Sequence, residues 1–354
     1  MSKFWNDTVK NIDPYVPGEQ PQDKKYIKLN TNENPYPPSD KVIEAMKDAV
    51  NGDLKLYPDP ECTKLVETIA NYYNLKKDQV FVGNGSDEVL ALAFETFFSS
   101  DKTILFPDIS YSFYPVYSKL FNLNYEMVEL DENFEVPIEE FMKPNGGVIL
   151  PNPNAPTAKF IETDKIKRIL EANKDSVVVI DEAYVDFGGE SVVKFIKDYP
   201  NLLVIQTLSK SRSLAGLRGG FAMGDKDLIQ GLNNVKNSFN SYTLDRVALA
   251  GAVAAFEDKE YFEKTRRKIM DTREKTVKRL RELDFNVVDS TANFVFASHK
   301  NIDGQTMYSK LKDKGVLVRH WNEPRISDYL RITIGTDEEM DILIEKIKEI
   351  INNK

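Results

Sequence analysis

The stretches SVVVIDEAYVDF (residues 176–187) and LLVIQTLSKSRSLAGLRGG (residues 202–220) decide the fold. Each begins with a nearly uninterrupted apolar run, which ends at Asp181 in the first stretch and shortly before Lys210 in the second. Short apolar runs between polar segments are typical of strands buried on both faces of a parallel sheet. Active sites in such sheets lie at the carboxyl ends of the strands. The two polar ends therefore predict residues of one site.

Further short apolar runs lie outside these two stretches and alternate with helical patterns such as 87–98 and 165–173. Strand and helix alternation of this kind predicts an α/β fold with a mostly parallel or mixed sheet, covered by helices on both faces in three layers. The further runs are VFVGNG (80–85), TILFPD (103–108), GGVILPNP (146–153) and GGFAMG (219–224).

The sequence pattern changes from about residue 240. A long charged helix is expected at 259–283, followed by the strand patterns VVDSTANFVFAS, VLVRHW and LRITIG and by a C-terminal helix. We predict an N-terminal arm (1–30), a large domain (31–240) and a smaller α+β domain (241–354). The arm carries three prolines, Pro14, Pro17 and Pro21, so it is either laid over another surface or a loose terminus.

Composition excludes several classes of protein. The 354 residues carry a net charge of -9, which predicts no partnership with nucleic acid or anionic membranes. Cys62 is the single cysteine and His299 and His320 are the only histidines, so we expect no disulfide and no metal site. Neither a leader-like apolar segment nor a run of roughly 20 apolar residues is present, which predicts a cytoplasmic protein.

Lys210 is the first candidate for the chemistry. A lysine in a loop is usually a solvated surface residue, whereas one that attacks an aldehyde must spend time neutral, which a desolvated pocket with cationic neighbours allows. Ser209 and Arg218 follow the same strand and could bind a phosphate beside the resulting imine.

Asp181 is the second candidate. A carboxylate at the end of a buried strand needs a partner, because an unpaired buried charge is unfavourable. That partner is either a protonated pyridine nitrogen, as in pyridoxal phosphate (PLP), or a helix end or structural arginine. Tyr184, three residues on, could donate to the phenolic oxygen of PLP.

A phosphate site is expected where the strand of VFVGNGSDEV meets the following helix. Gly83 and Gly85 allow a close backbone approach, and N–H groups at a helix start bind anions, although Ser86 could equally be an N-cap. Tyr111 lies just after another strand, where its ring could stack on a flat heterocycle. We interpret Phe113 and Tyr114 as packing residues without a role in the chemistry.

Seven motifs, in order from about residue 10 to the end of the chain, resemble the histidinol-phosphate aminotransferases, a subfamily of the fold type I PLP enzymes. The resemblance implies a seven-stranded sheet in the large domain and a homodimer with its active site at the subunit interface. The motifs are LNTNENPYPPS (29–39), YPDPEC (57–62), GNGSDE (83–88), NPNAPT (152–157), DEAYVDF (181–187), TLSKSRSLAGLR (207–218) and LRITIGT (330–336).

The resemblance implies a role for each matching residue around PLP. Lys210 would form the Schiff base and shuttle the proton, Asp181 would bind the pyridine nitrogen, and Tyr184 would bind the phenolic oxygen. The phosphate would be held by Ser86, Asp87, Ser209, Arg218 and, from the other subunit, Tyr57, with Tyr111 over the ring.

The resemblance also implies the substrate contacts. Arg331 matches the arginine that binds the α-carboxylate through its bidentate fork, and Arg319 matches the one proposed to hold the distal phosphate. Tyr15 and the segment from Asn32 to Tyr36 match the arm that closes over the substrate.

Two positions depart from the family pattern. Ala155 stands where the family commonly has an asparagine that bonds the phenolic oxygen, so either Tyr184 carries this contact alone or Asn154 substitutes. Ala158 stands where the family usually has glycine, and its Cβ disfavours a positive φ in this turn.

The function implied is transamination between L-histidinol phosphate and 2-oxoglutarate in histidine biosynthesis, giving imidazole-acetol phosphate and L-glutamate. Three alternatives stay open: an aminotransferase for aromatic amino acids, a PLP-dependent decarboxylase of a phosphorylated amino acid, and a non-catalytic regulator that senses PLP. A fused DNA-binding domain would favour the last, and the N-terminal arm has no room for one.

Overall fold

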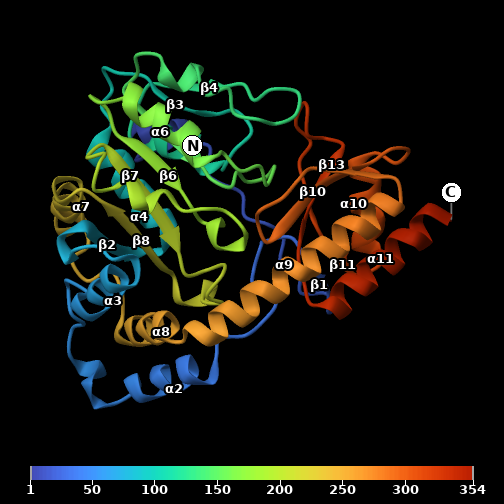
Figure 1. The fold of residues 1–354 in the computed structure, drawn as a ribbon, viewed down its shortest axis with the longest axis horizontal. Coiled ribbons are helices and arrows are strands. Elements are labelled where there is room, and N and C mark those ends of the chain that lie inside the picture. Colours follow the sequence, from blue (N-terminus) through green and yellow to red (C-terminus); the bar gives the residue numbers. More distant parts are fainter. Residues whose placement is uncertain (1, 353–354) are drawn as a thin grey trace.

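The large domain is built on a seven-stranded mixed sheet (Figure 1). A computed structural model describes residues 2–352 of the chain. The strand order is β2-β8-β7-β6-β5-β3-β4. The bounds are β2 Val80–Asn84, β3 Ile104–Pro107, β4 Tyr125–Val128, β5 Gly147–Pro151, β6 Val178–Asp181, β7 Leu202–Thr207 and β8 Gly219–Gly224.

Strand β8 is antiparallel to both of its neighbours, β2 and β7, while the pairs from β7 to β4 are parallel. The carboxyl ends of β2, β3, β5, β6 and β7 therefore meet at one edge of the sheet, together with the amino end of β8. The predicted α/β fold with a mixed, mostly parallel sheet is confirmed.

Alternate residues of each central strand pack into different cores, as the period of two requires. In β5, Val148 and Leu150 join one core and Ile149 joins the other. Each of these side chains is fully buried, which contributes roughly 1.5–3 kcal/mol apiece to folding. Seven helices supply the two outer layers. One face carries α2 Asp40–Ala49, α3 Thr63–Tyr73, α6 Thr163–Ala172 and α8 Arg246–Glu257, and the other carries α4 Gly85–Phe97, α5 Phe113–Leu120 and α7 Lys226–Phe239.

The small domain holds a four-stranded antiparallel sheet of order β12-β13-β10-β9 with its own core. Its helices are α9 Lys259–Glu282, α10 Gly304–Asp313 and α11 Asp337–Asn352. Its strands are β9 Phe285–Val287, β10 Phe294–His299, β12 Arg319–His320 and β13 Tyr329–Thr333, and a separate short strand, β11 Val316–Leu317, pairs with β1 Ile27–Lys28.

The segments at the domain borders pack across them. Helix α8 lies on α2 in the large-domain core, and α9 then runs diagonally to the small domain (Figure 1). Leu29, by contrast, is buried in the small-domain core. The division at 30/31 and 240/241 thus stays a prediction. Over residues 2–352, no helix combines the length and the apolar character that a membrane crossing needs.

Candidate active site

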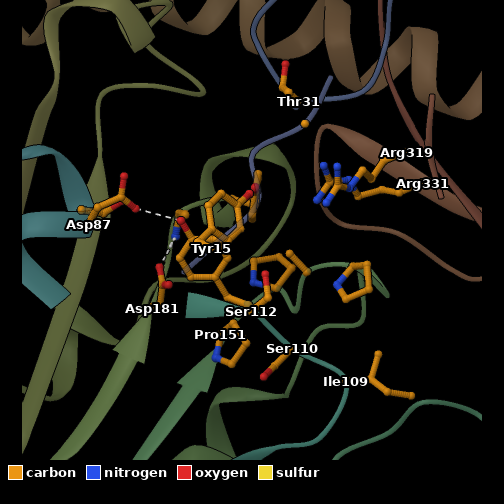
Figure 2. A pocket seen from close by; sticks show the side chains of 18 of the residues that line it. Tyr15, Thr31, Asp87, Ile109, Ser110, Ser112, Pro151, Asp181, Arg319 and Arg331 are labelled. Carbon is orange, nitrogen blue, oxygen red and sulfur yellow. Dashed lines mark hydrogen bonds between the residues drawn. The ribbon is translucent and has the colours of Figure 1, made fainter. Parts of the chain in front are cut away.

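A cavity of about 440 Å³ opens at the carboxyl edge of the large sheet (Figure 2). The large domain, the N-terminal arm and the small domain all contribute to its wall. Eleven of the predicted site residues line it: Tyr15, Ser86, Asp87, Tyr111, Asp181, Tyr184, Ser209, Lys210, Arg218, Arg319 and Arg331. The structure therefore brings together side chains that lie far apart in the sequence.

Asp181 is the last residue of β6 and is 5% exposed. Its Oδ2 accepts a hydrogen bond from Tyr114 Oη at 3.0 Å, and its Oδ1 accepts one from the Ala183 N–H at 3.2 Å. Burial raises the pKa of Asp181 to about 6, although both hydrogen bonds favour the charged form. No cation of the described chain forms an ion pair with this carboxylate, so a ligand with a protonated nitrogen suits it.

Lys210 lies in the loop after β7. Its Nζ donates to the Thr31 carbonyl at 3.2 Å and lies 5.7 Å from the centroid of the Tyr184 ring. Asn34 Nδ2 donates to the carbonyls of Lys210 and Ser211, at 3.0 and 3.2 Å. The lysine is thus held by its backbone, while its amine faces the cavity without an acidic partner in residues 2–352.

A close backbone approach forms the anion cradle. Gly220 lies so near that a Cβ there would overlap the backbone of Gly85 and Ser86 at the start of α4. A Cβ on Gly85 would lie 2.6 Å from Arg218 Nη2. Arg218, at φ +55°, pairs its Nη2 with Asp87 Oδ2 at 2.9 Å. Exposed N–H groups beside a guanidinium suit a phosphate.

Tyr111 connects this cradle to the middle of the cavity. Its Oη donates to Asp87 Oδ1 at 2.8 Å, and burial followed by the charge of Asp87 raises the pKa of the phenol far above its usual range. Its ring packs edge-on against Tyr114, with centroids 5.8 Å apart. Tyr111 therefore keeps its proton and offers a fixed ring face.

Arg319 and Arg331 form the opposite wall, with their heads close together in Figure 2. They are paired across β12 and β13, and each guanidinium carbon lies 5.3 Å from the centroid of the Trp321 ring. Burial lowers the pKa of Arg331, and the charge of Arg319 adds to this effect. Arg331 Nη2 donates to the Asn30 carbonyl, but its buried Nε lacks a hydrogen-bond partner.

Three predicted residues lie outside the cavity wall. Asn32 is buried, and its Nδ2 donates to Tyr184 Oη at 3.0 Å, so it supports Tyr184 from behind. Asn154 Nδ2 donates to the Ile109 carbonyl and to Thr157, while its Oδ1 is buried without a partner. Tyr57 is 76% exposed and stacks on Tyr242, with centroids 4.6 Å apart.

Two turn residues bear on the departures noted in the sequence. Ala155 lines the cavity, but its methyl group offers no hydrogen bond there. Ala158 is fully buried and does adopt a positive φ of 65°. The turn therefore keeps a left-handed residue even with a Cβ at this position, a conformation that costs roughly 1–2 kcal/mol outside glycine.

The sequence reasoning missed part of the site. Tyr114 packs in the core as expected, but it also bonds Asp181, a contact that no local pattern indicates. Asn34 and Thr31 hold Lys210, and the Trp321 ring, which lines the cavity, packs against the heads of both arginines.

The sheet, the lysine, the buried acid and the anion cradle are those of an aminotransferase of class I and II, whose family model matches residues 24–347. The histidinol-phosphate aminotransferase of Clostridium beijerinckii is 67% identical over 353 residues, covering 100% of this chain and 99% of that protein. The chain belongs to the histidinol-phosphate aminotransferase family, as its motifs had indicated.

Solved structures agree with this assignment. The crystal structure of the histidinol-phosphate aminotransferase from Clostridium acetobutylicum has a TM-score of 0.86 at 25% identity, covering 93% of this chain and 100% of that one. The enzyme from Sinorhizobium meliloti, in complex with pyridoxal-5'-phosphate, has a TM-score of 0.89 at 21% identity and 99% coverage of both chains. At that identity, the second likeness shows the fold.

Proposed function

We propose that this chain transfers the amino group of L-histidinol phosphate to 2-oxoglutarate, with PLP as its cofactor, in histidine biosynthesis. The observation that carries the proposal is that one cavity has a cofactor-binding wall on the sheet side and an anion-binding wall on the small-domain side. Lys210 and Asp181 face it from the sheet, and Arg319 and Arg331 face it from the small domain without acidic partners in the described chain. The name of the 67% identical relative supports the substrate.

PLP fits the sheet side of the cavity on three observations. The Gly85–Gly220 approach and Arg218 suit its phosphate, and the buried Asp181 suits its ring nitrogen. Ser86, Asp87 and Ser209 complete the phosphate end, Tyr111 offers a ring face, and Tyr184 an Oη for the phenolic oxygen. When bound, PLP supplies the withdrawal of electrons from the substrate Cα.

The residues of the chain divide the remaining work. Lys210 Nζ would hold the aldehyde carbon of PLP until the substrate amine displaces it, and the freed amine would then take up and return the proton of the substrate Cα as a positioned general base and acid. Asp181 keeps the ring nitrogen protonated, since a charged carboxylate favours the proton there. The Asn32 side chain fixes the Tyr184 phenol that faces the phenolic oxygen. Asn154 stays a candidate for that contact, but its amide is tied to Ile109 and Thr157.

Two neighbouring arginines suit the two substrates. L-Glutamate presents an α-carboxylate beside the reacting carbon, whereas histidinol phosphate presents a phosphate ester. We assign the carboxylate to Arg331 and the distal phosphate to Arg319, because a guanidinium binds either group through two parallel hydrogen bonds. Tyr15, stacked on Phe113 with centroids 4.3 Å apart, covers the substrate from the arm.

The absorbance spectrum of the purified protein tests the proposal. The visible band of lysine-bound PLP should bleach fastest with L-histidinol phosphate and also with L-glutamate. Faster bleaching by L-phenylalanine would move the substrate to the aromatic class, which the Tyr15 and Tyr111 rings in the cavity wall suit. Carbon dioxide release from threonine phosphate would indicate the decarboxylase. A protein that takes up no PLP would overturn the proposal.

We propose that two copies associate through the face that carries Tyr57. Tyr57 stacks on Tyr242, and the exposed apolar side chains of the segments around these two residues are Val50, Leu54, Leu56, Tyr57, Phe239 and Tyr242. Arg246 donates to the carbonyls of Leu56 and Tyr57, at 3.3 and 2.8 Å, so the exposed Tyr57 ring is held in place. An ordered, exposed aromatic group of this kind suits an interface, from which Tyr57 would reach the partner's phosphate site.

Mixing two inactive variants tests the shared site. Tyr57→Ala and Lys210→Ala chains, unfolded and refolded together, should recover up to about a quarter of wild-type activity, because half of the dimers are hybrids with one intact site. No recovery, with hybrids present by mass, would place Tyr57 in its own subunit's site or outside it.

We also propose that the protein acts in the cytoplasm. Cys62 is buried and unpaired, which suits a reducing compartment. Cell fractionation followed by the bleaching assay would locate the activity, and recovery outside the cytoplasmic fraction would contradict the proposal.

A further inference from the structure

Tyr114, on the first turn of α5, lies directly behind the cavity wall and does not line it. Its ring is fully buried, and its Oη donates to Asp181 Oδ2 at 3.0 Å. The same ring packs edge-on against Tyr111, with an interplanar angle of 84°. One side chain therefore contacts both the acid assigned to the ring nitrogen and the ring assigned to stack on the cofactor.

These contacts belong to a continuous chain of groups. Arg218 pairs with Asp87, Asp87 accepts from Tyr111, Tyr111 packs on Tyr114, and Tyr114 donates to Asp181. This series of contacts extends from the phosphate cradle at β2 and β8 to the acid at the end of β6. Tyr114 is the member that joins the two ends.

The hydrogen bond from Tyr114 acts on a carboxylate that burial disfavours. Of the two hydrogen bonds to Asp181, that of Ala183 comes from the turn itself, and that of Tyr114 is the one from a side chain. Two charged groups act on Asp181 from nearby elements: Asp87 on α4 opposes its ionisation, and Lys210 after β7 favours it. Loss of the phenol would therefore leave a carboxyl that is more often neutral.

We propose that Tyr114 is a positioning residue, which keeps Asp181 charged and oriented toward the ring nitrogen of PLP. The inference rests on the proposed function, and it gives a role to a residue that sequence reasoning assigned to packing. Tyr114 acts through Asp181, so its effect should appear only where a ring nitrogen is present.

The test compares the binding of PLP with that of an analogue in which carbon replaces the ring nitrogen. In Tyr114→Phe, the dissociation constant of PLP should rise roughly tenfold, the size expected when a hydrogen bond to a charged group is lost, and that of the analogue should not change. Equal weakening of both ligands would indicate a general structural role and overturn the inference. A wild-type protein that does not prefer PLP to the analogue would overturn the role of Asp181 as well.

Two further variants separate the phenol's effect from a loss of packing. Tyr117→Phe is the matched control: it removes a buried phenol one turn on, where Tyr117 Oη donates to the Asp87 carbonyl at 2.9 Å. Its preference for PLP over the analogue should equal that of the wild type. In an Asp181→Asn background, Tyr114→Phe should change the PLP dissociation constant by less than about twofold. A second tenfold loss there would show that Tyr114 acts independently of Asp181.

Discussion

The two sides of the cavity are organised differently. On the sheet side, the polar groups are already bonded to one another: Arg218 to Asp87, Asp87 to Tyr111, and Asp181 to Tyr114. On the small-domain side, Arg319 and Arg331 lie together, and neither forms an ion pair with a residue of the described chain. Burial lowers the pKa of Arg331, and repulsion by the neighbouring Arg319 lowers it further.

This difference separates a permanent ligand from an exchanging one. A preorganised set of groups binds a cofactor without further ordering, which favours long residence. Arginines without an ion pair instead gain the most binding free energy when an anion arrives. The anion offsets the repulsion between the two cations and offers an acceptor to the unsatisfied Nε of Arg331. The sheet side therefore suits a group that stays, and the arginine side suits substrates that come and go.

The strongest test of the sheet side is the removal of Lys210. Lys210→Ala should lower turnover by about 10⁴-fold, because proton transfer and covalent attachment are lost together. Steady-state rates with histidinol phosphate measure this loss. Lys194→Ala, which removes a surface lysine paired with Glu190, should keep wild-type rates. Turnover within tenfold of wild type would remove Lys210 from the chemistry.

The arginine side is tested by Arg319→Ala. The variant should lose about 100-fold in kcat/KM for histidinol phosphate and far less for glutamate, since a charge-assisted pair is lost with one substrate only. Half-reaction rates for each substrate provide the measurement, and the exposed Arg168→Ala is the control. Equal losses would contradict the division of labour between Arg319 and Arg331.

The pH dependence of the unfolding free energy tests how strongly burial raises the pKa of Glu182, the residue after β6. Burial raises the pKa of Glu182 to about 7 despite hydrogen bonds from Ser191, Val192 and Gln206. Because the folded pKa lies above the ordinary glutamate value of 4.5, this group's stabilising contribution is present below pH 4.5 and lost as the pH rises to about 7.

Between these pH values, the cofactor-free wild type should lose roughly 3 kcal/mol of unfolding free energy relative to Glu182→Gln. Urea unfolding at several pH values measures the difference. The unfolding free energy of the surface variant Glu190→Gln should change with pH in parallel with that of the wild type. Parallel curves for Glu182→Gln as well would show that this carboxyl titrates normally.

The smallest effect is expected at the arm. Glu19 accepts hydrogen bonds from Tyr308 and Lys312 and so attaches the arm to the small domain near Tyr15. Because the contact is partly exposed, Glu19→Gln should raise the KM for histidinol phosphate by no more than about fivefold and leave kcat unchanged. Glu345→Gln serves as the control. A large fall in kcat would make the arm part of the catalytic step.

The sequence predicted the layers of the large domain well, because each central strand is a short apolar run between polar turns. It did not predict that β8 is antiparallel, because a short apolar run such as GGFAMG does not indicate the direction of its strand in the sheet. The link 208–218 explains the outcome: it is too short for the crossover that a parallel neighbour of β7 would need.

The sequence brought the right residues to one cavity where they lie at or just after the end of a strand, as for Asp181, Lys210 and Tyr111, while their roles stay a prediction. It placed Tyr114 in the core but did not predict its hydrogen bond to Asp181, because a buried tyrosine gives the same helical pattern whether its hydroxyl bonds an acid or only packs. Asn154 was considered as a substitute for the asparagine that Ala155 replaces, but its amide turns to the Ile109 carbonyl.

The junction between α8 and α9 limits how this chain can be divided into fragments. Asp258 alone separates the two helices; it is 7% exposed and is bonded by Lys41 Nζ at 3.2 Å. A protease therefore meets no exposed link there. A recombinant fragment that starts at residue 241 would also lack β1 and Leu29, which pack with the small domain. The two halves of the molecule are best produced, and unfolded, as one piece.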